Sequence, residues 1–102
     1  MIRHIVLIRF RSDIEAAEIE AALKQVVALR DKIDGIVAIN AGENNSPEAL
    51  EKGFQHGFVV DFVDAATRDA YLPHPEHVIV GTKLVELAEN GVEGILVFDF
   101  RF

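Results

Sequence analysis

The sequence has 102 residues, a formal net charge of −7 at pH 7, a pI near 4.9 and no cysteine. A chain this acidic lacks the basic patch that nucleic acids and anionic membranes require, so neither is expected as a partner. The lack of cysteine excludes disulfides, thiolate metal sites and a cysteine nucleophile.

Half of the residues are hydrophobic, which is high for a chain that can bury only about two-thirds of its unfolded surface. The first apolar run, residues 5–8, is too short for a secretory signal, and no stretch is long enough to cross a bilayer. We expect a single domain, residues 1–102, that is cytoplasmic and has a second apolar face to bury.

Four segments show the alternation of β-strands: 2–10, 36–41, 54–63 and 94–102. In the first and third of these strands, one set of alternating side chains is expected to face the helices: His4, Val6, Ile8, Phe10, His56, Phe58, Val60 and Phe62. The first strand is apolar on both faces, so we place it in the interior of the sheet.

A helix is predicted after the first strand. Ser12 and Glu15 have the spacing of a capping box, and Gly35 is the expected C-cap. Apolar residues recur at steps of three and four between these two ends: Ile19, Ala22, Leu23, Val26, Leu29 and Ile33.

The polar segment 43–53 separates the second and third strands. Ser46-Pro47-Glu48 has the form of a helix start, which would give one helical turn closed by Gly53. The simpler interpretation, a hairpin connection that curls on itself, is favoured. We expect this segment to be a mobile rim outside the core.

Two further helices follow the third strand. Asp64 caps the first, 65–72, which ends at Pro73, and the second runs over 75–90. His77 lies on the apolar stripe of the second helix, near its beginning, with Val80, Leu84 and Leu87.

The element order is β-α-β-β-α-β, so the fold class is α+β: a ferredoxin-like, four-stranded antiparallel sheet with helices on one face. The other face would carry Ile5, Leu7, Val59, Leu96, Phe98 and Phe100. Soluble monomers rarely expose such a patch. We therefore expect a homodimer, a dimeric α/β barrel in which the two helix-free faces pack together.

The candidate catalytic residues lie in the stretch Tyr71-Leu72-Pro73-His74-Pro75-Glu76-His77. The two prolines reorient the chain, so that Tyr71 and His77 can face one space. A neutral imidazole can accept a proton from carbon, and a phenol can donate a hydrogen bond to a developing enolate. The plainer interpretation is a core histidine bonded to a backbone carbonyl or to Tyr71, with Tyr71 as a helix-end aromatic.

We expect a small apolar pocket between sheet and helices, because the covering helix carries small side chains at Ala22, Leu23, Val26 and Val27. The expected lining is His4, Val6, Ile8, Leu23, Val26, Val27, His56, Phe58, His74 and Val97. His74, between two prolines, also fits a solvent-facing corner. His4 and His56 begin antiparallel strands, so they should lie at opposite ends of the sheet, and one of them at most should join Tyr71 and His77.

No metal and no cofactor are predicted. His74, Glu76 and His77 lie close together in sequence, but their spacing matches no zinc signature. There is no glycine-rich phosphate loop and no nucleophile elbow. For Asp99 we expect a cap or a salt bridge.

The sequence resembles the stress-responsive α/β barrel (Dabb) family along nearly its whole length. The matching residues are Ile2 to Leu7, Asn45 to Glu48, Gly53 to His56, Tyr71 to His77 and Leu96 to Phe100. The resemblance implies a dimeric ferredoxin-like barrel. The family contains plant stress proteins without an agreed reaction beside a plant polyketide cyclase, in which the residues matching Tyr71 and His77 are the acid–base pair; histidines matching His4, His56 and His74 occur there too.

Two functions remain open. One is a cofactor-free cyclase or lyase that uses Tyr71 and His77 on an apolar carbonyl substrate. The other is a non-catalytic homodimer, stress-associated or small-molecule-binding, in which the same residues only fix the corner. A cofactor-free oxygenase is a third possibility, by analogy of fold.

Overall fold

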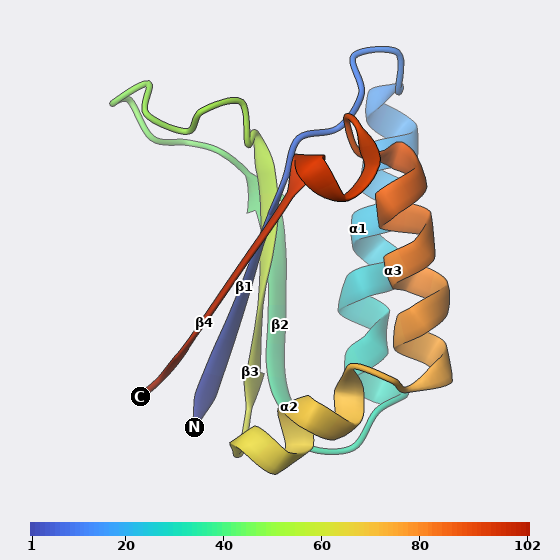
Figure 1. Ribbon diagram of the computed structural model, residues 1–102, viewed down its shortest axis with the longest axis vertical. Coiled ribbons are helices and arrows are strands. Elements are labelled where there is room, and N and C mark those ends of the chain that lie inside the picture. Colours follow the sequence, from blue (N-terminus) through green and yellow to red (C-terminus); the bar gives the residue numbers. More distant parts are fainter.

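The computed structural model describes residues 1–102 and shows a four-stranded antiparallel sheet with helices on one face (Figure 1). The strands are β1 (Ile2–Ile8), β2 (Ile36–Glu43), β3 (His56–Phe62) and β4 (Ile95–Arg101). The helices are α1 (Ala16–Ala28), α2 (Ala65–Tyr71) and α3 (Pro75–Leu87), with short 3-10 turns at Leu29–Asp31 and Gly91–Gly94. This is the predicted ferredoxin-like order, with the second helical segment divided at the Pro-His-Pro corner.

The sheet order β2-β3-β1-β4 puts β1 in the interior, as predicted. Burial alternates along β1 and β3, and the buried set faces the helices. The register pairs His4 with Asp99 on one side and with Val60 on the other, whereas His56 pairs with Ile8. His4 and His56 therefore share the helix face but lie at opposite ends of the sheet.

The start of α1 differs from the prediction. Glu15 occupies the N-cap position, and no side chain caps the helix. Ser12 lies instead in a turn closed by the hydrogen bond from the Ile14 amide to the Arg11 carbonyl. The Ser12–Glu15 capping box is thus wrong, because that turn holds Ser12 away from the first helical amides.

The helical turn considered after Ser46 does not form, and the favoured interpretation, a hairpin connection between β2 and β3, is confirmed. The segment between β2 and β3 contains only turns, and it projects away from the sheet as a long arm (Figure 1). Its base is held by the Arg9 guanidinium, which lies 4.5 Å from the centre of the Phe54 ring. β2 itself continues two residues beyond the predicted end, to Glu43.

Because the tip of this arm lies outside the core, Asn45→Ala should change the free energy of unfolding by less than about 0.5 kcal/mol. Asn45 is exposed. The matched control is Asn44→Ala, since the Asn44 side chain accepts a hydrogen bond from the Ser46 amide at 3.2 Å; its loss should lower stability by about 1 kcal/mol. Urea denaturation of both variants measures the two changes in the free energy of unfolding. A loss at Asn45 several times larger than predicted would show that the arm is structural.

One face of the sheet is bare of helices (Figure 1). Its large side chains are exposed in the single chain, among them Leu96, Phe98, Phe100 and Phe102. The rings of Phe98, Phe100 and Phe102 follow one another with centroids 6.4 and 6.1 Å apart. This apolar row on β4 belongs to the face that is predicted from the sequence to pack against a second copy of the chain. No helix of the chain combines the length and apolarity needed to cross a membrane.

Candidate active site at the corner between α2 and α3

The turn between α2 and α3 is built by the Pro-His-Pro sequence. α2 ends at Tyr71, and Pro75 occupies the first turn of α3. His74 is the N-cap of α3, and its Nδ1 accepts a hydrogen bond from the Glu76 amide at 3.1 Å. His74 therefore fixes the corner, and His77 lies in the first turn of α3.

The corner brings Tyr71 and His77 together. Their ring centroids are 4.1 Å apart, with an interplanar angle of 37°. His77 Nδ1 lies 2.9 Å from the Leu72 carbonyl oxygen. Because a carbonyl only accepts hydrogen bonds, Nδ1 carries the proton and Nε2 of the neutral ring is left unprotonated.

The Tyr71 side chain is fully buried, with 0% of its surface exposed, and its hydroxyl makes no hydrogen bond within the chain. Its ring packs edge-on against Phe62 and against His4, with centroids 4.9 and 5.9 Å away. Burial raises the pKa of the Tyr71 hydroxyl well above its usual range, so the phenol stays protonated. The Tyr71 hydroxyl can therefore donate a hydrogen bond, but no group in the chain accepts a hydrogen bond from it.

His77 is half-buried, and burial lowers its pKa from the usual 6.5, against the opposing effect of the Leu72 carbonyl. Neighbouring His4 and His74 lower the pKa of His77 further. His77 is therefore held neutral near pH 7, which is the form that can accept a proton.

The lowered pKa of His77 should make stability depend on pH. As the pH falls through 6.5, the unfolded chain binds a proton that folded His77 resists, so the free energy of unfolding should fall until the pH reaches the folded pKa. Urea denaturation from about pH 8 to about pH 5, at one protein concentration, measures the slope. His77→Gln should show a shallower fall. An equal or steeper fall in that variant would contradict the prediction.

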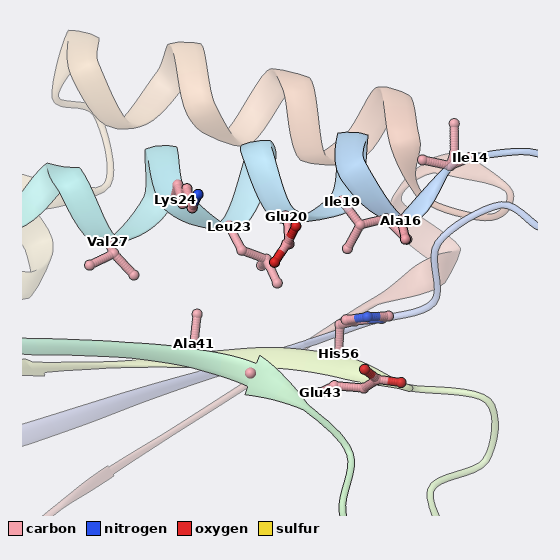
Figure 2. A pocket seen from close by; sticks show the side chains of 11 residues that line it. Ile14, Ala16, Ile19, Glu20, Leu23, Lys24, Val27, Ala41, Glu43 and His56 are labelled. Carbon is pink, nitrogen blue, oxygen red and sulfur yellow. The ribbon is translucent and has the colours of Figure 1, made fainter.

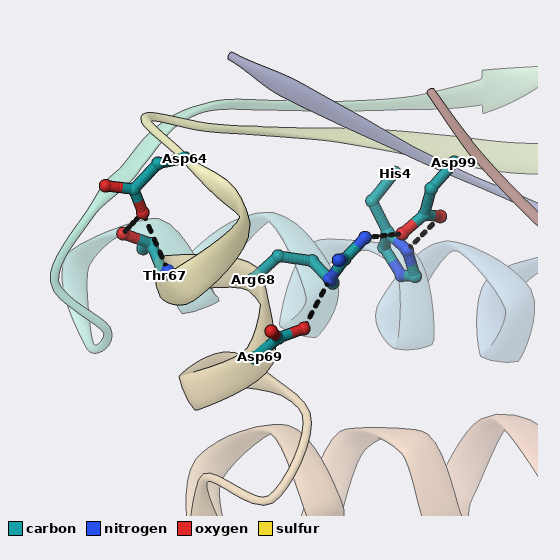
Figure 3. Close-up of polar contacts among 6 residues, drawn as sticks. All are labelled: His4, Asp64, Thr67, Arg68, Asp69 and Asp99. Atoms are coloured by element: carbon teal, nitrogen blue, oxygen red, sulfur yellow. Dashed lines mark hydrogen bonds and ion pairs between the residues drawn. The ribbon is translucent and has the colours of Figure 1, made fainter. Parts of the chain in front are cut away.

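His4 joins this corner, whereas His56 does not. The His4 side chain is buried, and its Nδ1 lies 2.7 Å from Asp99 Oδ1 on the neighbouring strand. The other oxygen of Asp99 accepts a hydrogen bond from Arg68 of α2 at 2.9 Å (Figure 3). Asp99 thus has the salt-bridge role that the sequence analysis expects.

A second feature is a cavity of about 820 Å³ at the other end of the helix face, between α1 and the ends of β2 and β3 (Figure 2). It is lined by Ile14, Ala16, Ile19, Glu20, Leu23, Lys24, Val27, Ala41, Gly42, Glu43 and His56. Its size is within the usual range for small-molecule pockets. Tyr71 and His77 do not line it, so the corner and the cavity are separate features.

The residues expected in the pocket divide into three groups. Leu23, Val27 and His56 line the cavity. Val6, Ile8, Val26 and Phe58 lie in the hydrophobic core and do not line it. His4 and His74 lie at the corner, as described, and Val97 is exposed on β4 next to Val6.

Several residues of both features were not predicted. Glu43 lies opposite His56 in the strand register and faces the cavity beside it. If the predicted second strand had been extended from residue 41 to residue 43, Glu43 would have been identified, because directly paired residues share a face of the sheet. Glu20 and Lys24 lie on the polar side of the α1 pattern, which we did not expect to face a pocket. No feature of the sequence around Arg68 indicated its contact with Asp99. No group of three or more histidine or acidic side chains is arranged to hold a metal ion.

Comparison with known proteins gives a consistent result. A model of the stress responsive A/B barrel domain family (Dabb) matches residues 2–102. The chain is 26% identical to the stress-response A/B barrel domain-containing protein HS1 of Arabidopsis thaliana, covering 98% of this chain and 88% of that protein. It is 26% identical to olivetolic acid cyclase of Cannabis sativa, covering 97% and 94%. It also resembles the crystal structure of a dimeric ferredoxin-like protein of unknown function from Jannaschia sp. CCS1, with a TM-score of 0.90, 30% identity and coverage of 99% and 98%.

Proposed function

Because the chain belongs to the stress responsive A/B barrel domain (Dabb) family, we propose that it is a homodimer that performs cofactor-independent acid–base chemistry on an apolar carbonyl compound. The observation that carries the proposal is the pairing of His77 with Tyr71. The imidazole has its tautomer fixed by a backbone carbonyl, and the buried phenol beside it has no hydrogen-bond partner in the chain. The cyclase relative supports chemistry of this class.

The homodimer is supported by the apolar row on β4 and by the dimeric ferredoxin-like protein of similar structure. Two helix-free faces packed together would remove the phenylalanine rings from water. The helix face, with the cavity and the half-buried His77, would lie outside this interface in each protomer.

The proposed step is enolisation. His77 Nε2 takes a proton from the carbon next to a ketone, the electron pair of that C–H bond forms the C=C bond, and the carbonyl oxygen becomes an enolate. The Tyr71 hydroxyl donates a hydrogen bond to this oxygen, where the negative charge develops. The enolate can then attack a second carbonyl or take a proton back from His77. Only a proton moves in this step, so it requires no redox partner.

Solvent exchange tests the proposal without knowledge of the natural substrate. The protein is incubated in deuterated buffer with a panel of 2-alkanones and 1,3-diketones, and loss of the α-proton signals is followed by NMR. We expect exchange faster than in buffer for the wild type and buffer rates for His77→Gln. Buffer rates for the wild type across the panel would contradict the catalytic proposal.

The cavity under α1 favours a second function, non-catalytic binding of a small apolar molecule. Its body is lined by aliphatic side chains of α1 and its end by His56 and Glu43 (Figure 2). The same 2-alkanones serve as probes. Chemical-shift changes confined to the cavity, lost in the cavity-filling variant Val27→Trp and unaccompanied by exchange, would identify the chain as a binding protein.

A further inference from the structure

Arg68 is the one cation of α2, and it connects this helix to the last strand (Figure 3). Its Nη1 donates to Asp99 Oδ2 at 2.9 Å, while its Nε donates to Asp69 Oδ1 at 2.8 Å. The side chains of Arg68 and Asp99 are 23% and 21% exposed, whereas that of Asp69 is 66% exposed. The contact with Asp99 is thus the shielded one of the two.

Asp99 uses its two oxygens on two different partners. Oδ2 accepts from Arg68, and Oδ1 lies 2.7 Å from Nδ1 of the buried His4. An ionised carboxylate only accepts hydrogen bonds, so Nδ1 of His4 carries the proton. In the neutral ring, Nε2 is then an acceptor on the side away from Asp99.

This arrangement is an orienting chain of charge-assisted hydrogen bonds that ends next to the proposed site. The His4 ring stands edge-on to the ring of Tyr71. Tyr71 follows Arg68 by three residues on α2. A partner that holds the second nitrogen of a functional histidine fixes both its tautomer and its ring orientation. With Arg68 on its other oxygen, the Asp99 carboxylate cannot turn away from His4 without breaking a second charged hydrogen bond.

We propose that Arg68 is a positioning residue of the corner site: through Asp99 it holds His4 in the Nδ1–H tautomer, and it ties the helix that carries Tyr71 to β4. Its value for catalysis rests on the proposed function, but the positioning itself does not. A merely structural surface ion pair would contribute little to stability, and its loss would leave the His4 tautomer unchanged.

The test is the spectroscopic signature of His4, read from long-range ¹H–¹⁵N correlation spectra of the intact protein. In the wild type we expect Nδ1 at a protonated and Nε2 at an unprotonated ¹⁵N position. In Arg68→Gln the carboxylate has lost its charged second donor, and both resonances should move toward intermediate, tautomer-averaged positions. Arg68→Lys keeps the positive charge and should restore the wild-type pattern in part.

The matched control is Asp69→Asn, which removes the exposed partner of Arg68 and leaves Asp99 untouched. It should give the wild-type His4 spectrum. Asp99→Asn, which alters the group that bonds His4 directly, should change the spectrum at least as much as Arg68→Gln. Wild-type His4 resonances in Arg68→Gln, or an equal change in Asp69→Asn, would overturn the proposal.

Ketone exchange measured on the same variants separates this inference from the proposed function. If the wild type exchanges, Arg68→Gln should lower the rate about tenfold, as expected for loss of a group that orients a functional histidine, with Asp69→Asn at the wild-type rate. If the wild type does not exchange but the His4 spectra change as expected, the catalytic function fails and the positioning role stands. Exchange that is fast and insensitive to Arg68→Gln would overturn its role in catalysis.

Discussion

Phe98→Asp is expected to convert a dimer into a monomer at micromolar concentration. Phe98 lies on β4 in the helix-free face, opposite Ile5 in the strand register, and is 60% exposed in the single chain. In a dimer formed by two such faces, the aspartate would be buried without a partner, which costs about 3–5 kcal/mol. Because each 1.4 kcal/mol is a factor of ten, the dissociation constant should rise at least about 100-fold.

Sedimentation velocity over a range of concentrations measures this change. The single chain leaves Phe98 mostly in solvent, so the variant should keep its far-UV circular dichroism spectrum. Ile79→Asp is the matched control, because Ile79 is 67% exposed but lies on α3, on the opposite side of the molecule. The control should remain a dimer. A wild type that sediments as a monomer would refute the proposed interface.

The sheet and its two faces could be predicted from the sequence because strand alternation is a local signal. It placed His4 on the helix face, and the strand register of the structure brings Asp99 directly opposite His4. The Pro-His-Pro corner was equally local, since each proline limits the residue before it. That is why the pairing of Tyr71 and His77 could be anticipated.

The features that could not be predicted depend on contacts between distant segments. Arg68 and Asp99 are 31 residues apart, and nothing in the pattern around Arg68 shows that its long side chain reaches across to β4. The capping box failed for a similar reason: the Arg11 side chain bonds to Asp13 and to the Glu86 carbonyl, and so fixes the turn that contains Ser12. In both cases the structure depends on a contact with a distant segment, which local residue spacing does not reveal.

The cavity under α1 was only partly anticipated. Leu23, Val27 and His56 were assigned to it, but the expected pocket extended through core positions such as Val26, which is fully buried. Periodicity identifies the face that a residue occupies, but it cannot tell which residues of that face pack together and which leave space. The gap forms where α1 meets the exposed end of β2 at Ala41 and Glu43.

Tyr71→Phe is expected to remove the proposed exchange activity and to raise stability at the same time. The buried Tyr71 hydroxyl has no hydrogen-bond partner in the chain, and an unsatisfied buried hydroxyl costs about 1–3 kcal/mol. Phenylalanine keeps the ring contacts with Phe62 and His77 and removes only the oxygen. The free energy of unfolding should therefore rise by about 1 kcal/mol, measured in urea at a fixed protein concentration.

The same variant loses the hydrogen-bond donor that we propose for the enolate oxygen, so α-proton exchange should fall to the buffer rate. A group retained at a cost in stability is typical of a functional site, where a polar atom awaits a partner that folding does not supply. His77→Gln provides the comparison, because it removes the base and leaves the phenol in place. A less stable Tyr71→Phe protein would show that the hydroxyl is structural, and undiminished exchange would show that the phenol takes no part in the step.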